Sequence, residues 1–170
     1  MKILLTGANG FIGTHLCNEL SNRNVGFRAT ARNANENNYA DFLSCDLETT
    51  DSLDQLMDGC DIVIHLAGRA HMTSDNSQEK YRVANELVTQ RLANAAAQNG
   101  ITRFVYLSSI KVNGESSNPG LPIRQSDTPH PLDNYGRSKL AAELALQAIC
   151  HDNSMEYVII RPTLVYGKGV

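Results

Sequence analysis

Short apolar runs alternate with longer amphipathic segments along the whole of this 170-residue chain. Several runs are almost continuously apolar, which is typical of strands in a parallel sheet that helices cover on both faces. The runs predict strands at Lys2–Thr6, Phe27–Thr30, Phe42–Cys45, Ile62–His65, Phe104–Ser108 and Tyr157–Arg161. Apolar residues at helical spacing predict helices at Phe11–Ser21, Ser52–Met57, Lys80–Gln98 and Tyr135–Cys150. The alternation predicts an α/β fold, a doubly wound parallel sheet of about six strands with right-handed crossovers.

Two polar segments separate these elements. Asn33–Asn38 is rich in asparagine and is typical of a surface loop. Asn113–Pro131 contains Gly, Ser and Pro and joins the fifth strand to the last helix. A loop of that length inside a compact domain is usually functional.

Charge and cysteine content narrow the class of protein. The net charge is −3 and no cluster of Lys and Arg occurs, which argues against a nucleic acid or an anionic membrane as the main partner. No apolar run approaches membrane-spanning length, and the N-terminus is too short in apolar residues for a signal peptide. The cysteines lie far apart without metal-binding spacing, so we expect reduced, mostly buried thiols, no metal site and a cytoplasmic protein. These cysteines are Cys17, Cys45, Cys60 and Cys150.

Three glycines follow the first strand and precede a helix. Gly7, Gly10 and Gly13 form a G-x-x-G-x-x-G pattern. Glycine lets the backbone approach a phosphate closely, and the helix N-terminus directs free N–H groups and a partial positive charge towards it. The order of strand, glycine turn and helix therefore predicts a bound dinucleotide whose pyrophosphate lies at the turn. The alternative is a glycine-rich turn that only packs the helix against the strand.

A tyrosine and a lysine begin the last predicted helix. Tyr135 and Lys139 are four residues apart and share one helix face. A free tyrosine has a pKa of about 10, and a nearby ammonium favours the phenolate, which can take a proton from an alcohol as hydride leaves its carbon. Ser108 and Ser109 end the fifth strand, where ligands lie in open α/β sheets, and a hydroxyl there can hold the reacting oxygen. An exposed helix pair and an ordinary strand end are the alternatives.

The end of the second strand bears on the choice of cofactor. An acidic residue there would bind the ribose hydroxyls of NAD, but Ala31 stands at that place and Arg32 follows it. Arginine is a planar bidentate donor that suits a 2′-phosphate, so the sequence favours NADP over NAD, with a surface arginine beside NAD as the alternative. Asp46 either accepts from an adenine amino group or caps the next helix, and His65 fits a structural histidine better than a catalytic one. Asn85 is either solvated or a brace between strands near the active site.

Together these residues resemble the extended short-chain dehydrogenase/reductase superfamily, specifically its nucleotide-sugar epimerase/dehydratase family of the UDP-glucose 4-epimerase type. The matching segments follow family order over the entire chain: Thr6–Gly13, Asp46-Leu47, His65–Gly68, Asn85 with Thr89, Ser108–Gly114, Tyr135–Lys139 and Arg161–Gly167. The resemblance implies a Rossmann fold with a catalytic set of Ser109, Tyr135 and Lys139. Cofactor contacts are implied for Gly7, Gly10, Phe11, Ile12 and Gly13 at the pyrophosphate, Asp46 and Leu47 at the adenine, Leu66, Ala67 and Gly68 beside the ribose and pyrophosphate, Pro162 near the nicotinamide and Lys139 on the ribose.

The resemblance implies an NAD(P)-dependent enzyme that acts at carbon 4 of a UDP-sugar. UDP-galactose 4-epimerases typically carry a lysine where Ala70 stands. The segment Ser108–Glu115 instead resembles a bacterial branch that includes both epimerases and 4-keto reductases. An NADPH-dependent reductase of a 4-keto nucleotide sugar therefore stays open beside the epimerase, and a relative that acts on a non-sugar ketone is a further alternative. A catalytically silent, cofactor-sensing scaffold is the alternative from another class. The family pairs as a homodimer through the outer faces of helices 80–98 and 135–150. Its sugar-nucleotide domain lies largely after the sixth strand, so we expect residues 1–170 to form the NAD(P)-binding domain of a longer protein.

Overall fold

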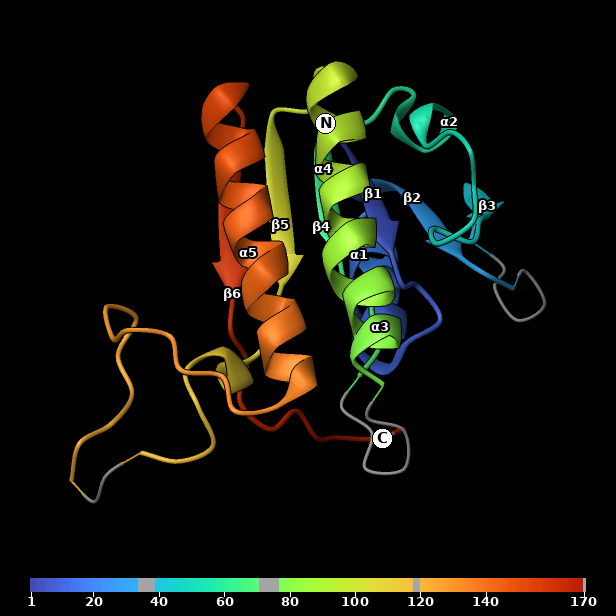
Figure 1. The fold of residues 1–170 in the computed structure, drawn as a ribbon. Coiled ribbons are helices and arrows are strands. Elements are labelled where there is room, and N and C mark those ends of the chain that lie inside the picture. The colour runs from blue at the N-terminus through green and yellow to red at the C-terminus, as the bar shows by residue number, and fades with distance from the viewer. Residues whose placement is uncertain (34–38, 71–76, 118–119, 170) are drawn as a thin grey trace.

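A single parallel sheet forms the centre of the chain. The computed structural model describes residues 1–33, 39–70, 77–117 and 120–169 (Figure 1). The strands are β1 (Lys2–Thr6), β2 (Gly26–Ala31), β3 (Phe42–Ser44), β4 (Ile62–His65), β5 (Arg103–Leu107) and β6 (Glu156–Ile160). Their order across the sheet is β3-β2-β1-β4-β5-β6, and all neighbours are parallel. The predicted doubly wound sheet is confirmed.

The strand order reverses at β1. The chain moves outward from β1 to β3 and then returns to place β4 on the other side of β1. Thr6, the last residue of β1, pairs with Thr30 of β2 and with His65 of β4. The ends of these strands are therefore level, and the loops that leave them border one crevice at the carboxyl edge, where ligands bind in open α/β sheets.

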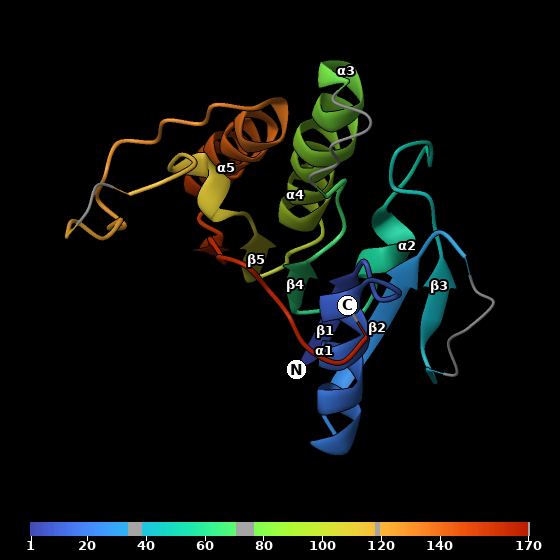
Figure 2. The ribbon, with the colours of Figure 1, turned by 90° about the horizontal axis from the view of Figure 1, so that it is seen from below.

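Helices cover the sheet on both faces. Helix α1 (Phe11–Asn22) lies on one face (Figure 2). The opposite face carries α5 (Asn134–Asp152) and a continuous helical segment of α3 (Gln78–Tyr81), the π-helical turn η1 (Arg82–Leu87) and α4 (Val88–Gln98). Short turns α2 (Asp54–Met57) and η2 (Ile110–Val112) lie between strands.

Successive strand residues divide between two apolar cores, because alternate side chains of a strand point to opposite faces. Leu4 and Phe104 pack with Leu92 of α4 in one cluster, whereas Ile3 and Leu5 belong to a second cluster on the face of α1. Each fully buried leucine contributes roughly 1.5–3 kcal/mol to folding. The two cores together hold both helical layers on the sheet.

β1 and β4 have the predicted bounds, and the other element boundaries differ from the predicted ones by at most two residues. The largest difference is in the helix predicted at Lys80–Gln98, which begins at Gln78 and contains the π-helical turn Arg82–Leu87. Of the predicted loops, the described parts of 113–131 contain no helix or strand, and residues 34–38 lie outside the described residues.

The cysteines are free thiols, and all except Cys45 are buried, as predicted. Within the described ranges no helix is long and apolar enough to cross a membrane. The same residues contain no cluster of His, Cys, Asp and Glu that could hold a metal ion.

Candidate active site

The glycine turn after β1 is held by backbone contacts that leave no room for a side chain. Gly7 has a φ of +72°, which favours glycine, and a Cβ on it would lie 2.7 Å from the Ala67 nitrogen. A Cβ on Gly13 would lie 2.1 Å from the Gly7 carbonyl oxygen. The turn thus packs the start of α1 against β1 and the segment after β4. This packing brings the N-terminus of α1, with its free N–H groups, to the carboxyl edge of the sheet.

Two cavities meet at this turn. The larger, of about 830 Å³, lies over the ends of β1, β2 and β3, and the smaller, of about 300 Å³, lies between the glycine turn, the end of β5 and the start of α5. All site residues predicted from the sequence border one or both. Those on both are Gly7, Gly10, Leu66 and Gly68; those on the larger are Arg32, Asp46, Leu47 and Ala67; those on the smaller are Phe11, Ile12, Gly13, Ser109, Tyr135, Lys139 and Pro162.

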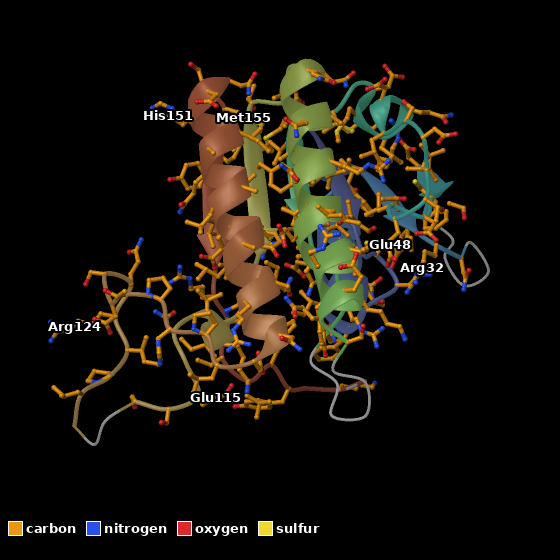
Figure 3. The ribbon with its side chains drawn as sticks, in the orientation of Figure 1. Arg32, Glu48, Glu115, Arg124, His151 and Met155 are labelled. Atoms are coloured by element: carbon orange, nitrogen blue, oxygen red, sulfur yellow. The ribbon has the colours of Figure 1, made fainter. Side chains whose placement is uncertain are left out.

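The larger cavity carries opposite charges at its outer end. Arg32, after β2, and Glu48, in the loop after β3, both line it, and Figure 3 labels them at the same edge of the molecule. Asp46 does not cap the next helix, because Leu53 stands at that position; its Oδ1 instead accepts from the Glu48 backbone nitrogen at 3.0 Å. Arg91 of α4 donates to the Glu48 carbonyl oxygen at 3.2 Å and holds this loop against the helix.

Tyr135 is placed by the start of α5. The Asp133 carboxylate caps the helix by accepting from the Gly136 nitrogen at 2.6 Å. A Cβ on Gly136 would lie 2.7 Å from the Lys111 carbonyl oxygen, so the helix start packs closely on η2. The Tyr135 ring is half-buried, borders the smaller cavity, and lies with its centroid 5.8 Å from that of Tyr81.

Burial raises the pKa of Tyr135. A hydrogen bond from the Ser109 hydroxyl and the positive charge of Lys111 act in the opposite direction and lower that pKa in part. The net direction is opposite to the one that the Tyr–Lys spacing predicts. The physical reason is that burial outweighs the favourable contacts, and Lys139, whose Nζ donates to the Leu107 carbonyl oxygen at 3.0 Å, is not among the groups that lower this pKa.

Lys139 is buried between α5 and the sheet, with 5% of its surface exposed. Its Nζ lies 4.8 Å from the ring centroid of Tyr106. Burial lowers the pKa of Lys139 to about 8, and the negative charge of Glu143 raises it in part. A Cβ on Gly68 would lie only 3.3 Å from Nζ, so the glycine keeps the ammonium open to the junction of the two cavities.

Asn85, buried in the π-helical turn η1, braces the loop after β4 against α5. Its Oδ1 accepts from the Arg69 backbone nitrogen at 2.8 Å. Its Nδ2 donates to the Arg69 carbonyl oxygen at 3.2 Å and to the Ser138 hydroxyl at 3.0 Å. The expected brace is present, but it joins a loop to a helix rather than two strands. π-Helical turns occur frequently at functional sites.

His65 belongs to a buried chain of hydrogen bonds. Thr89 donates to the Asn85 carbonyl oxygen at 2.6 Å, so its oxygen accepts from the His65 Nε2–H at 3.1 Å. Thr6 then donates to Nδ1 at 2.7 Å, and its oxygen accepts from the Ala67 nitrogen at 3.2 Å. Burial lowers the pKa of His65 to about 3, and the ring is neutral. The structural interpretation of this fully buried histidine is confirmed.

Sequence reasoning missed some residues of the two cavities. Glu48, Arg69 and Thr163 each follow a strand end within a few residues, and that position is the signal that could have found them. Val83 and Val88 form an apolar side of the larger cavity. Sequence alone does not separate these valines from core residues on the same helix face.

The strand order, the glycine turn and the cavities at the carboxyl edge define a Rossmann domain of the dinucleotide-binding class. The chain belongs to the NAD dependent epimerase/dehydratase family, whose family model matches residues 3–170.

Known proteins that resemble the chain include both epimerases and reductases. UDP-glucose 4-epimerase from Vibrio cholerae is 40% identical over 99% of this chain and 53% of its own length. 2-Alkyl-3-oxoalkanoate reductase from Stenotrophomonas maltophilia (strain K279a) is 30% identical over 99% of this chain and 52% of its own length. The crystal structure of UDP-glucuronic acid 4-epimerase from Bacillus cereus in complex with NAD is 30% identical, with a TM-score of 0.84 over 98% of this chain and 57% of that chain. The chain spans about half the length of the relatives it matches.

Proposed function

We propose that the protein is an NAD(P)-dependent enzyme that acts at carbon 4 of the sugar in a UDP-sugar, and that its net reaction is epimerisation. The observation that carries the proposal is the convergence of Ser109, Tyr135 and Lys139 on the smaller cavity, directly beside the glycine turn. The epimerases among the similar proteins supply the substrate class.

A dinucleotide fits the residues that line the two cavities. The glycine turn and the start of α1 would hold the pyrophosphate, because the contacts of Gly7 and Gly13 exclude side chains where N–H groups converge. The loop at Asp46 and Leu47 would hold the adenine end, and Lys139 with Pro162 the nicotinamide end. When bound, the nicotinamide supplies the acceptor and the donor of hydride.

Tyr135 is the acid/base in the proposed mechanism. Its phenol oxygen takes the proton of the sugar 4-hydroxyl as the carbon loses hydride, and returns a proton to that oxygen in the second half of the reaction. Ser109, whose hydroxyl bonds the Tyr135 phenol, holds the same sugar oxygen. The ammonium of Lys139 reaches the junction of the cavities and orients the ribose. Because burial raises the pKa of Tyr135, positive charge at the site is needed before it can act as a base near neutral pH.

A reductase is the second candidate, and Arg32 is the observation that favours it. Its guanidinium lies at the larger cavity, where it would bind the 2′-phosphate of NADP. A reductase would run only the return half of the reaction, from a 4-keto sugar. A silent scaffold is less well supported, because Tyr135 and Lys139 both border the smaller cavity. The homodimer stays a prediction; Leu144, 57% exposed on α5, offers apolar surface for it.

The test of the proposal is turnover of UDP-sugars by the protein and its Tyr135→Phe variant. An epimerase converts UDP-glucose or UDP-glucuronic acid into its 4-epimer, followed by NMR, without net consumption of cofactor, whereas a reductase consumes NADPH stoichiometrically. Tyr135→Phe removes only the ionisable oxygen, so turnover falls roughly 10²–10⁴-fold while NAD affinity is nearly unchanged.

Tyr157→Phe on β6 is the matched control, because this tyrosine is 44% exposed and does not line the cavities. It should leave turnover at the wild-type level. Full turnover by Tyr135→Phe would show that another group moves the proton.

A further inference from the structure

A third polar residue continues the Tyr135–Lys139 pattern along α5. Tyr135, Lys139 and Glu143 are each four residues apart, so they form one stripe on the helix. Glu143 is only 1% exposed. A carboxylate is almost never buried without partners, and the mechanism proposed above does not use this one.

Glu143 binds both strands that end beside the smaller cavity. The Ser108 hydroxyl, at the end of β5, donates to Glu143 Oε1. Arg161, directly after β6, donates from Nε to Oε1 at 2.9 Å and from Nη2 to Oε2 at 2.5 Å. Arg161 Nη1 also donates to Asn113 Oδ1 at 3.1 Å, which extends the network into the loop after η2.

Both partners lie at the smaller cavity, since Ser108 lines it and Arg161 is next to a residue that does. Ser108 precedes Ser109, and Arg161 precedes Pro162; both Ser109 and Pro162 line the smaller cavity. The segments that follow β5 and β6 form two walls of the smaller cavity. Backbone hydrogen bonds also join these walls, from the Ser108 nitrogen to the Ile160 carbonyl oxygen at 2.8 Å and from the Ile110 nitrogen to the Pro162 carbonyl oxygen at 2.9 Å. Glu143 therefore adds a buried side-chain link between the two walls, because its carboxylate accepts from Ser108 in one and from Arg161 in the other.

The negative charge of Glu143 also acts on the ammonium of Lys139. The titratable groups around Lys139 are His65 from β4, Tyr106 from β5, and Tyr135 and Glu143 from α5. His65 is neutral, and burial raises the pKa of both tyrosines. Among these described groups Glu143 is thus the negative charge, and it raises the pKa of Lys139 against the effect of burial.

We propose that Glu143 is a positioning residue that fixes the ends of β5 and β6 on either side of the smaller cavity and supplies the counter-charge of Lys139. The role rests on the proposed function, because the cavity matters only if Ser109, Tyr135 and Lys139 act there. Its two parts, position and charge, are separated by two substitutions.

Glu143→Gln keeps the length of the side chain and removes its charge. The readout is the titration of Lys139, followed by the ¹³Cε signals of isotope-labelled lysines in the 170-residue chain and assigned with Lys139→Arg. We expect the pKa of Lys139 to fall below that of the wild type, because the negative charge that raises it is lost. NAD affinity should fall with it, and more strongly at alkaline than at neutral pH. If Glu143→Gln folds and Lys139 titrates as in the wild type, Glu143 does not act as the counter-charge of Lys139.

Glu143→Asp keeps the charge and shortens the side chain. Lys139 should titrate as in the wild type, while NAD affinity falls several-fold at every pH because the walls are no longer fixed. Unchanged NAD affinity overturns the positioning role, and this variant decides that role even if Glu143→Gln does not fold. Glu156→Gln is the matched control, since it removes the carboxylate of an exposed pair with Arg103 and should alter neither readout.

The lysine titration also distinguishes this inference from the proposed function. It needs no cofactor and no turnover, so a wild-type chain that fails to bind NAD would count against the proposed function alone. The response of Lys139 to Glu143→Gln would still support or overturn the inference.

Discussion

Acid should destabilise the folded chain through His65. The ordinary histidine pKa of 6.5 applies to the unfolded chain, and burial, helped by the charge of Lys139, lowers it to about 3 in the folded chain. The folded state therefore resists taking up the proton. The stabilisation is fully present above about pH 6.5 and is lost as pH falls towards 3. At 1.36 kcal/mol per pKa unit the complete loss is about 5 kcal/mol, and about half of it is lost by roughly pH 4.5.

The hydrogen bonds of His65 give the physical reason for this loss. The neutral ring accepts at Nδ1 from Thr6 and donates at Nε2 to Thr89. A second ring proton would face the Thr6 hydroxyl, whose oxygen already accepts from the Ala67 nitrogen. Protonation therefore replaces the bond from the Thr6 hydroxyl to Nδ1 and puts a positive charge into the buried chain that fixes the segment after β4, next to the glycine turn.

Urea unfolding between about pH 7.5 and 4.5 measures the effect as the slope of unfolding free energy against pH. His65→Gln should be less stable at neutral pH, and its slope should be smaller than that of wild type by up to 1.36 kcal/mol per pH unit. His151→Gln, at a side chain that is 88% exposed, is the control and should leave the slope unchanged. Equal slopes for wild type and His65→Gln would refute the reasoning. If His65→Gln does not fold, the pKa of His65 in the folded wild type can be measured by NMR, and a value near the ordinary 6.5 would refute the reasoning as well.

Two further substitutions test the larger cavity and the glycine turn. Arg32→Ala should weaken NADP binding by roughly 1.5–3 kcal/mol and NAD binding much less, measured by calorimetry, because a charge-assisted contact with the 2′-phosphate is lost. Arg124→Ala should change neither affinity, because Arg124 lines neither cavity and lies on the opposite side of the molecule from Arg32 in Figure 3. Equal losses for both cofactors would make Arg32 a surface residue. Gly13→Ala should abolish dinucleotide binding and lower the melting temperature, because its Cβ would lie 2.1 Å from the Gly7 oxygen. Gly26→Ala is the control, because its Cβ would have its nearest neighbour at 3.7 Å. Wild-type binding by Gly13→Ala would contradict the packing argument.

The fold could be predicted from the sequence because its parallel strands are short, apolar and bounded by polar turns. β1 and β4 have the predicted bounds, since their alternate residues fill two opposite cores and both ends meet polar or glycine residues. The π-helical turn at Arg82–Leu87 could not be predicted. Its apolar positions fit an α-helix equally well, and the hydrogen bonds of Asn85 to the loop after β4 become visible only in three dimensions.

Some features of the candidate site could likewise be predicted from the sequence, and others could not. Gly7, Ser109 and Tyr135 could be placed from the sequence, because strand ends and helix starts converge at one edge of a parallel sheet. The direction of the Tyr135 pKa could not, because burial sets it and Lys139, bonded to the Leu107 carbonyl, is not among the groups that lower it. Spacing on a helix shows that two side chains share a face. It does not show which third group each of them binds.

The two cavities explain why a single turn matters to the whole site. Leu66 and Gly68 follow β4 and border both cavities, and the Ala67 nitrogen between them donates to Thr6 at 3.2 Å. Thr6 is in turn bonded to His65, so the position of this segment depends on a neutral histidine in the core. A change in the charge of that buried ring would thus reach the segment that borders both cavities. Acid should therefore weaken dinucleotide binding in step with the loss of stability, as the junction between the two cavities loosens.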